Sequence, residues 1–161
     1  MLSFRSMDSF ILREREHSAF LSELRKLRSN ALAKAVFLVD KNGTLIVSTG
    51  ETSGVDVTAL ASLAAGNIAA TGGLANLIGE KEFSILFHEG ERDNMHISVV
   101  ADRLILVVIF DRRSSVGLVR LRVKRASEEL AKILASVDQK AGEEGVLIEE
   151  LTEEDIESLF C

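Results

Sequence analysis

The stretch LILVVIF (residues 104–110) and the periodic segment that begins at residue 116 decide the fold of this chain. The first is apolar at every position, which is typical of a central strand that is covered on both faces. The second repeats apolar residues at steps of three and four, which predicts a long amphipathic helix over residues 116–137. Its stripe consists of Val116, Val119, Val123, Ala126, Leu130, Ile133 and Val137. Ser114 or Ser115 is placed to cap its start.

Upstream of the central strand, the apolar pattern changes between helical and strand periodicity. The Asn42-Gly43 pair between two strand-like runs predicts a hairpin with positive φ at both turn positions. Asp56 or Ser53 is a candidate N-cap for an Ala- and Leu-rich helix, and Gly79 is its candidate terminator. The predicted elements are a helix over 13–29, strands over 33–40 and 45–48, a helix over 55–78, and strands over 83–88 and 95–100.

The order of these elements predicts an α/β (α+β) domain with the sequence α-β-β-α-β-β-β-α. Short connections favour a five-stranded antiparallel sheet, with one helix on one face and the two terminal helices on the other. We expect an N-terminal extension over 1–12, one domain over 13–138, and an acidic tail over 139–161. Within the tail, residues 141–145 read as a linker and 152–160 as a short amphipathic helix.

Composition excludes several functional classes. The 161-residue chain has a formal net charge of −6 and contains no Trp or Tyr, which argues against nucleic-acid binding through basic or base-stacking surfaces. The single cysteine, Cys161, cannot form an internal disulfide and fits a reducing cytoplasm. The apolar run at 104–110 is too short to span a bilayer as a helix, so no membrane insertion is expected.

Motifs that carry catalytic chemistry are absent from the sequence. There is no P-loop, no dinucleotide-binding glycine pattern and no nucleophile elbow. The histidines at 17, 88 and 96 have no ligand spacing, and a triad of His96 with Ser98 and Asp102 lacks support from spacing. We therefore predict no catalytic residue, no metal and no cofactor, and the chain is not expected to be an enzyme.

The helix over 55–78 carries the most informative surface pattern. No charged residue occurs from Val57 to Ile78, whereas a solvated helix face is usually rich in Lys and Glu. Such a face is either a protein-docking platform or dimer seam, or a surface buried inside its own domain. The residues of its small-side-chain face are Thr58, Ser62, Ala65, Ala69, Gly72 and Asn76.

Charge is segregated near the C-terminus. Arg112, Arg113, Arg120 and Lys124 belong to a basic stretch without acids, and residues 143–157 hold eight acids without a base. The two stretches are either solvated surfaces, partners of each other, or contacts for a binding partner of opposite charge.

Four segments resemble the Roadblock family, and in particular its regulators of bacterial gliding motility. They are FLVDKNG (37–43), ASLAAGNIAATGGLANLIGE (61–80), FHEG (87–90) and LVVIFDRRSSVGLVRLRVKRASEEL (106–130). The resemblance covers residues 30–137 closely and the acidic end more loosely. It implies a Roadblock fold and a homodimer whose sheets join through the strand at 83–88, with the two middle helices side by side.

The resemblance also implies a function. Such regulators bind a Ras-like small GTPase across the helix platform and activate GTP hydrolysis without supplying an arginine finger, so the basic residues are not assumed to be catalytic. Ala65 and Ala69 match small platform positions, and the other four residues of that face extend them by helical geometry. The tail residues Ile156, Leu159 and Phe160 are implied contacts of the GTPase from another side. A cytoplasmic location, including the cell poles, is expected.

Two other functions fit the same fold. A Roadblock scaffold would recruit a GTPase or motor partner without accelerating hydrolysis. A ligand-sensing domain would need a cavity with convergent polar groups, and the sequence offers no obvious set.

Overall fold

The structure, a computed structural model, describes residues 14–149 and the side chains of residues 14–139. Its element order is the predicted one, α-β-β-α-β-β-β-α. The elements are α1 (Glu14–Asn30), β1 (Ala35–Asp40), β2 (Leu45–Gly50), α2 (Val57–Leu77), β3 (Ile85–Glu89), β4 (Asn94–Val100), β5 (Leu104–Phe110) and α3 (Val116–Glu149).

The five strands form one antiparallel sheet in the order β2-β1-β5-β4-β3, which confirms the predicted fold class. Strand β5 is central, as its uninterrupted apolar sequence predicted, and six of its seven residues are buried. Strand β3 pairs only with β4 among the described residues, so it leaves one edge of the sheet unpaired.

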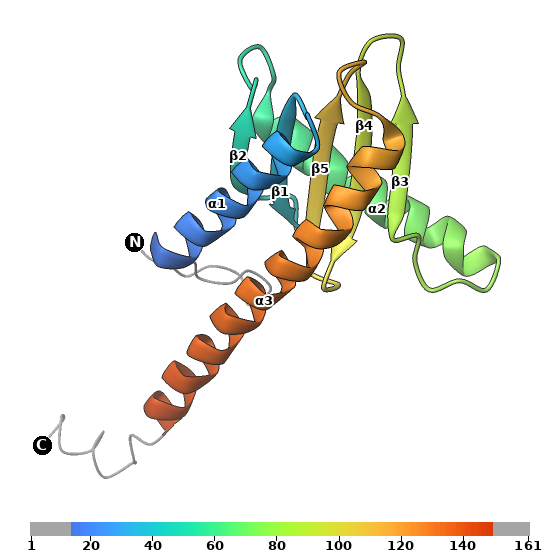
Figure 1. Ribbon diagram of the computed structural model, residues 1–161. Coiled ribbons are helices and arrows are strands. Elements are labelled where there is room, and N and C mark those ends of the chain that lie inside the picture. Colours follow the sequence, from blue (N-terminus) through green and yellow to red (C-terminus); the bar gives the residue numbers. More distant parts are fainter. Residues whose placement is uncertain (1–13, 150–161) are drawn as a thin grey trace, which may run out of the picture.

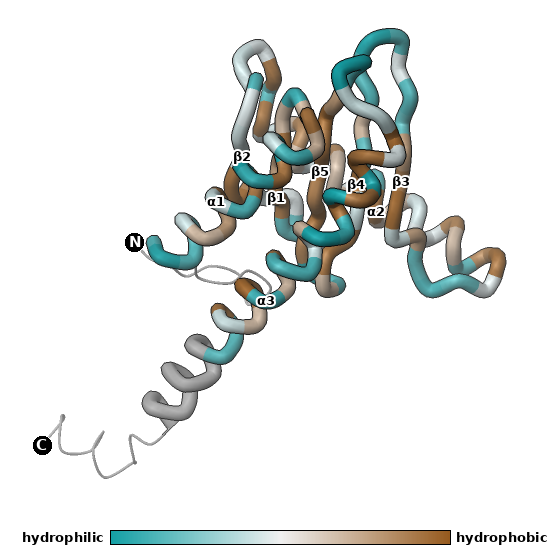
Figure 2. Tube along the Cα trace, viewed as in Figure 1, coloured by the Kyte–Doolittle hydropathy of each residue, from teal (hydrophilic) through white to brown (hydrophobic). Residues whose placement is uncertain are grey.

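Helices cover both faces of the sheet, as Figure 1 shows: α1 and α3 lie on one face, and α2 crosses the other. The first face holds a core that includes Phe20 and Leu24 of α1 and Leu130 of α3. The second face holds a core that includes Phe37 of β1 and Ile68 of α2. The strands between the two layers are the most hydrophobic part of the trace in Figure 2.

The β1–β2 turn differs from the prediction. Only Gly43 has a positive φ (93°), so the expectation that Asn42 would share this conformation was wrong. The reason is the Asp40 carboxylate, whose Oδ1 accepts hydrogen bonds from the backbone N–H groups of Asn42 (2.9 Å) and Thr44 (3.2 Å). The backbone N–H of Gly43 also bonds the Asp40 carbonyl at 3.0 Å. The turn is therefore longer than a two-residue type I′ turn.

Two consecutive residues with positive φ occur instead between β4 and β5. Ala101 (φ 52°) and Asp102 (φ 60°) form that turn. This combination is the conformation of a type I′ hairpin turn, which matches the right-handed twist of the flanking strands. Glycine and asparagine normally occupy it, so the residues Ala101 and Asp102 did not indicate such a turn.

Both long helices begin at predicted caps. The Asp56 carboxylate accepts a hydrogen bond from the Ala59 backbone N–H at 3.0 Å, and α2 ends before Gly79, which has φ 82°. The Ser115 hydroxyl accepts from the Leu118 backbone N–H at 3.2 Å at the start of α3. Ser114 has another role, because its hydroxyl donates to the Ala31 carbonyl and thereby ties the end of α1 to the start of α3.

Helix α3 is longer than the periodic stripe predicted. It continues as helix to Glu149, so the interpretation of residues 141–145 as a linker was wrong. Glutamate and alanine have high helix propensity, and one helix can absorb the two glycines there at about 1 kcal/mol each. The predicted short helix over 152–160 lies outside the described residues.

Helix α2 is the one described helix that is long and apolar enough to cross a membrane, judged by length and composition alone. Only 17% of its most apolar window is buried within the protomer. A helix with this composition leaves an uncharged surface exposed, and large surfaces of that kind mark interaction sites.

Candidate functional site

Small residues attach α2 to the sheet. Ala61, Ala64, Ile68 and Ala75 are its buried residues. The short side chains of the three alanines allow the helix backbone to lie close to β1 and β5. The larger apolar side chains of α2 point elsewhere and form a row that we call the leucine row, made of Leu63 (73% exposed), Leu74 (58%), Leu77 (82%) and Ile78 (70%).

The leucine row lies on the side of α2 that faces the unpaired sheet edge. Asn67, which falls on the same flank, places its side-chain amide nitrogen 3.0 Å from Nε2 of His88 on β3. Figure 1 shows the C-terminal part of α2 projecting past β3. On the opposite face of the sheet, Ile85 and Phe87 of β3 are 47% and 40% exposed. An exposed strand edge with apolar neighbours on both faces is an incomplete interface.

The six residues predicted to bind a partner, which we call the small ridge, occupy the other flank of α2. Thr58, Ser62, Ala69 and Asn76 are exposed, while Ala65 and Gly72 are half-buried. At about 100° per residue, this flank lies roughly a quarter turn from the buried face, and the leucine row lies roughly a third of a turn from that face on the other side. The structure thus brings the six residues together, and it separates them from the leucine row.

A hollow of about 740 Å³ runs beside the small ridge. Ala65, Ala69, Gly72 and Asn76 line it, together with Lys41, Lys81, Glu82 and Asp102. The Lys41 ammonium and the Glu82 carboxylate form an ion pair of 3.0 Å at its rim. The hollow therefore combines an uncharged floor with charged walls, an arrangement that suits a protein partner.

Part of the small ridge also serves packing within the protomer. A Cβ placed on Gly43 would lie 3.3 Å from Cα of Ser62 and 3.6 Å from Cβ of Ala65. The β1–β2 turn therefore approaches α2 at these two residues, and glycine is favoured there by its positive φ and by the close contact with Ser62. Thr58, Ala69 and Asn76 have no such role and remain available to a partner.

Basic residues singled out by the sequence lie on the face opposite the small ridge. Arg113 is ion-paired with Asp111 (3.0 Å) and Glu51 (3.5 Å). Its hydrogen bonds hold the pKa of the Asp111 carboxyl below the ordinary value. Arg112 is exposed in the same loop and lines a hollow with Lys34.

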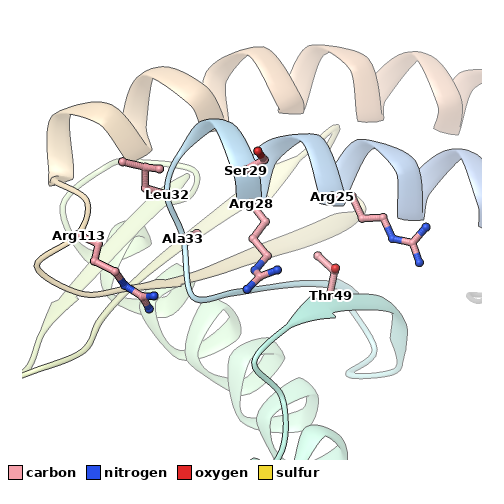
Figure 3. A pocket seen from close by; sticks show the side chains of 7 residues that line it. All are labelled: Arg25, Arg28, Ser29, Leu32, Ala33, Thr49 and Arg113. Atoms are coloured by element: carbon pink, nitrogen blue, oxygen red, sulfur yellow. The ribbon is translucent and has the colours of Figure 1, made fainter.

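Three arginines line a pocket of about 360 Å³ at the end of α1, shown in Figure 3. Arg28 points down from α1 beside Thr49 of β2, Arg25 points outward from α1 on the other side of Thr49, and Arg113 enters from the loop before α3. Arg28 donates from Nε to the Lys34 carbonyl at 3.2 Å, which fixes the C-terminal end of α1 to the start of β1. The sequence pattern identified Arg113 but did not indicate the two α1 arginines.

Arg120 and Lys124 lie apart from this pocket, on the exposed side of α3 next to β4. The structure therefore divides the basic stretch into two groups and brings neither group to the small ridge. The predicted tail contacts Ile156, Leu159 and Phe160 lie outside the described residues. Among the described residues, no group of three or more His, Cys, Asp and Glu side chains is arranged to hold a metal.

A sheet with helices on both faces, an unpaired edge strand and an uncharged helix beside that edge defines a protein-interaction module. The chain belongs to the Roadblock/LC7 domain family, whose model matches residues 22–110. The matched region extends from α1 to the end of β5 and therefore includes α2 and the whole sheet. A comparison with curated proteins found no match.

Within that family the chain is similar to solved MglB structures. Myxococcus xanthus MglB is 54% identical over 80% of this chain and 96% of that chain, with a TM-score of 0.75. The gliding protein MglB from Thermus thermophilus is 32% identical over 78% and 95% of the two chains, with a TM-score of 0.73. An MglB described as having a tetrameric arrangement is 30% identical over 80% and 97%, with a TM-score of 0.76.

Proposed function

We propose that this chain acts as a homodimeric regulator of a Ras-like, MglA-like small GTPase and stimulates its GTP hydrolysis. The observation that carries the proposal is the uncharged α2, which exposes the leucine row on one flank and the small ridge on the other. One flank serves a twin protomer and the other serves the GTPase. The similarity to MglB proteins, one of which is a gliding protein, supports the same proposal.

The dimer in this proposal forms around β3. Pairing of two β3 strands would satisfy the free edge, and the leucine rows of two α2 helices would cover each other. Each symmetric pair would bury residues that are more than half exposed in the protomer, such as Leu63 and Leu74. A twofold arrangement also doubles the small ridge into one broader platform.

The GTPase in this proposal docks on that platform, with Ala69 and Asn76 at the contact. The regulator contributes no catalytic side chain and stabilises the hydrolysis-competent conformation of the GTPase by binding it better than the relaxed one. A 10⁴-fold shift of that equilibrium needs about 5.5 kcal/mol of differential binding. In this proposal residues 13–138 form the domain that dimerises and binds the GTPase, and the tail over 139–161 contacts the GTPase separately.

Basic and tail residues have secondary roles in the proposal. Arg112, Arg113, Arg120 and Lys124 lie behind the sheet, so they would meet acidic partner surfaces that extend around its edge rather than the docked platform. Ile156, Leu159 and Phe160 would contact the GTPase from another side, as the family resemblance implies. Cytoplasmic action, including at the cell poles, belongs to the same proposal.

A single-turnover GTP hydrolysis assay with an MglA-like GTPase tests the proposal. Ala69→Arg places a long charged side chain on the exposed ridge, and we expect it to preserve the dimer and to abolish binding and stimulation. The matched control is Ala135→Arg, because Ala135 is an exposed alanine of α3 on the opposite face. Full stimulation by the Ala69→Arg variant would reject the assigned surface.

The same assay separates activation from recruitment. Binding of the GTPase without faster hydrolysis would favour the scaffold function over activation. Repeating the measurement with a chain that ends at residue 138 isolates the contribution of the tail. Loss of stimulation in that shortened chain, with binding retained, would assign activation to the tail rather than to the platform.

A further inference from the structure

A second cleft lies on the face of the sheet that carries α3, away from the small ridge. It has a volume of about 690 Å³ and separates α3 from strands β3 and β4. Ile85, His96 and Ser98 line it from the strands, and Arg120, Leu121 and Lys124 line it from the helix. Its size is in the range of sites that hold small organic molecules.

Two polar side chains at the base of this cleft are buried without partners. His96 is 1% exposed and Ser98 is 4% exposed. Neither ring nitrogen of His96 nor the hydroxyl of Ser98 makes a hydrogen bond to any described residue. Buried polar groups nearly always have a partner, so two adjacent ones on the same strand face require an explanation.

Strand geometry explains why both groups face the cleft. Side chains alternate along β4, so His96 and Ser98 point to the α3 face while Ile97 between them enters the core under α2. Apolar residues at both positions would extend the core without any unpartnered polar atom. The polar pair is therefore a feature that packing alone does not require.

The helix wall of the cleft is positively charged. Arg120 and Lys124 are one helical turn apart on the exposed side of α3, and neither forms an ion pair with a described residue. Among the residues that the structure describes, Glu128 is the one acidic residue that lines the cleft. Next to these charges, Leu121 and Ile85 are 55% and 47% exposed. The cleft thus combines cations, hydrogen-bond donors and an apolar wall.

We propose that this cleft binds a small amphipathic organic anion. Its carboxylate or phosphate head group accepts hydrogen bonds from His96 and Ser98 and is neutralised by Arg120 and Lys124. Its apolar body lies against Leu121 and Ile85. The burial of His96 and the nearby charge of Arg120 lower the pKa of its imidazole, so the ring is neutral at pH 7 and donates one hydrogen bond. All of the residues named here belong to one protomer, and Ile85 lies on β3, the strand around which the proposed dimer forms.

Titration of the ¹⁵N-labelled full chain with three eight-carbon probes tests the proposal. Octanoate and octyl phosphate carry the two candidate head groups, and octan-1-ol has the same apolar body without charge. We expect saturable shifts in amides of residues 96–100 and 120–124 with at least one anion, and at least tenfold weaker binding of the alcohol. The tighter anion identifies the head group. No saturable shift with either anion, or equal binding of the alcohol, would overturn the proposal.

Variants on the exposed helix wall locate the site without disturbing the fold. Lys124→Met should weaken binding of the preferred anion at least tenfold, whereas Lys132→Met, which changes an exposed lysine of α3 outside the cleft, should leave it unchanged. Equal effects of the two substitutions would show that the anion binds elsewhere.

Replacement of the buried histidine separates a ligand-binding role from a structural one. His96→Leu removes two unpartnered nitrogens, so we expect the melting temperature to rise while anion binding falls at least tenfold. A lower melting temperature with unchanged anion binding would mean that His96 supports the fold and takes no part in a site.

Discussion

Removing one leucine from the exposed flank of α2 tests the proposed dimer quantitatively. Leu74 is 58% exposed in the protomer, so Leu74→Ser leaves the fold of the isolated protomer nearly unchanged. If a twin helix covers this side chain completely, the fraction that becomes buried stabilises the dimer. Burying a whole leucine is worth about 1.5–3 kcal/mol.

The symmetry of the dimer doubles the effect, because each dimer contains two copies of Leu74. Twice 58% of that range is about 1.7–3.5 kcal/mol per dimer. At about 1.4 kcal/mol per tenfold change, the dissociation constant of the dimer should rise between roughly 20-fold and 300-fold.

Sedimentation equilibrium over a wide range of protein concentration measures that constant directly. The matched control is Leu32→Ser, because Leu32 is 53% exposed at the far end of the sheet, next to β1. We expect the control to dimerise like the unmodified chain. If the dissociation constant of the Leu74→Ser dimer is unchanged, the leucine row is not the dimer interface. If the unmodified chain is monomeric at all concentrations, the proposed dimer itself is refuted.

Three further predictions concern stability, and urea denaturation measures each of them. Burial and the nearby charge of Arg120 lower the pKa of His96 in the folded chain below its ordinary 6.5, so the unfolded chain binds more protons than the folded chain as the pH falls through 6.5. The free energy of unfolding should therefore decrease below pH 6.5, and His96→Leu should reduce this decrease. Ala101→Gly should stabilise the chain by roughly 0.5–1 kcal/mol, because Ala101 has φ 52°; destabilisation would mean that the methyl group makes a necessary contact. Asp56→Ala should cost about 1 kcal/mol through loss of the α2 cap, whereas Asp56→Asn should restore most of it.

Local patterns predicted the elements of the sheet and helices well. The apolar run of β5 identified the central strand, because a short continuous run of β-branched and aliphatic residues is typical of a strand buried on both faces. The stripe of α3 identified its buried face, since Val119, Val123 and Leu130 are all buried. Turn chemistry was less predictive: the carboxylate of Asp40 displaced the expected two-residue turn, and the type I′ conformation occurred at Ala101 and Asp102, where no glycine marks it.

The candidate sites depend on information that spacing along one element does not contain. Helix α2 is apolar nearly all round, so a helical projection could group its small residues but could not show that Ala61 and Ala64 face the sheet while Leu63 and Leu74 are exposed. That orientation depends on how the helix crosses the strands.

The second cleft was missed for the same reason. The polar pair on β4 and the cations on α3 are far apart in sequence, and only the packing angle of α3 brings them to one space. From the sequence alone, His96 and Ser98 indicate no more than an unusual strand face, and Lys124 no more than a solvated charge.

The length of α3 affects how far this molecule can reach. Val137 is the last buried hydrophobic residue of α3 among the described side chains, and the helix continues for 12 residues to Glu149, which at 1.5 Å per residue is about 18 Å. Figure 1 shows this part extending beyond the sheet. A fluorophore attached near residue 149 would therefore lie far from both flanks of α2, and we expect it to report on rotation of the domain without disturbing either flank.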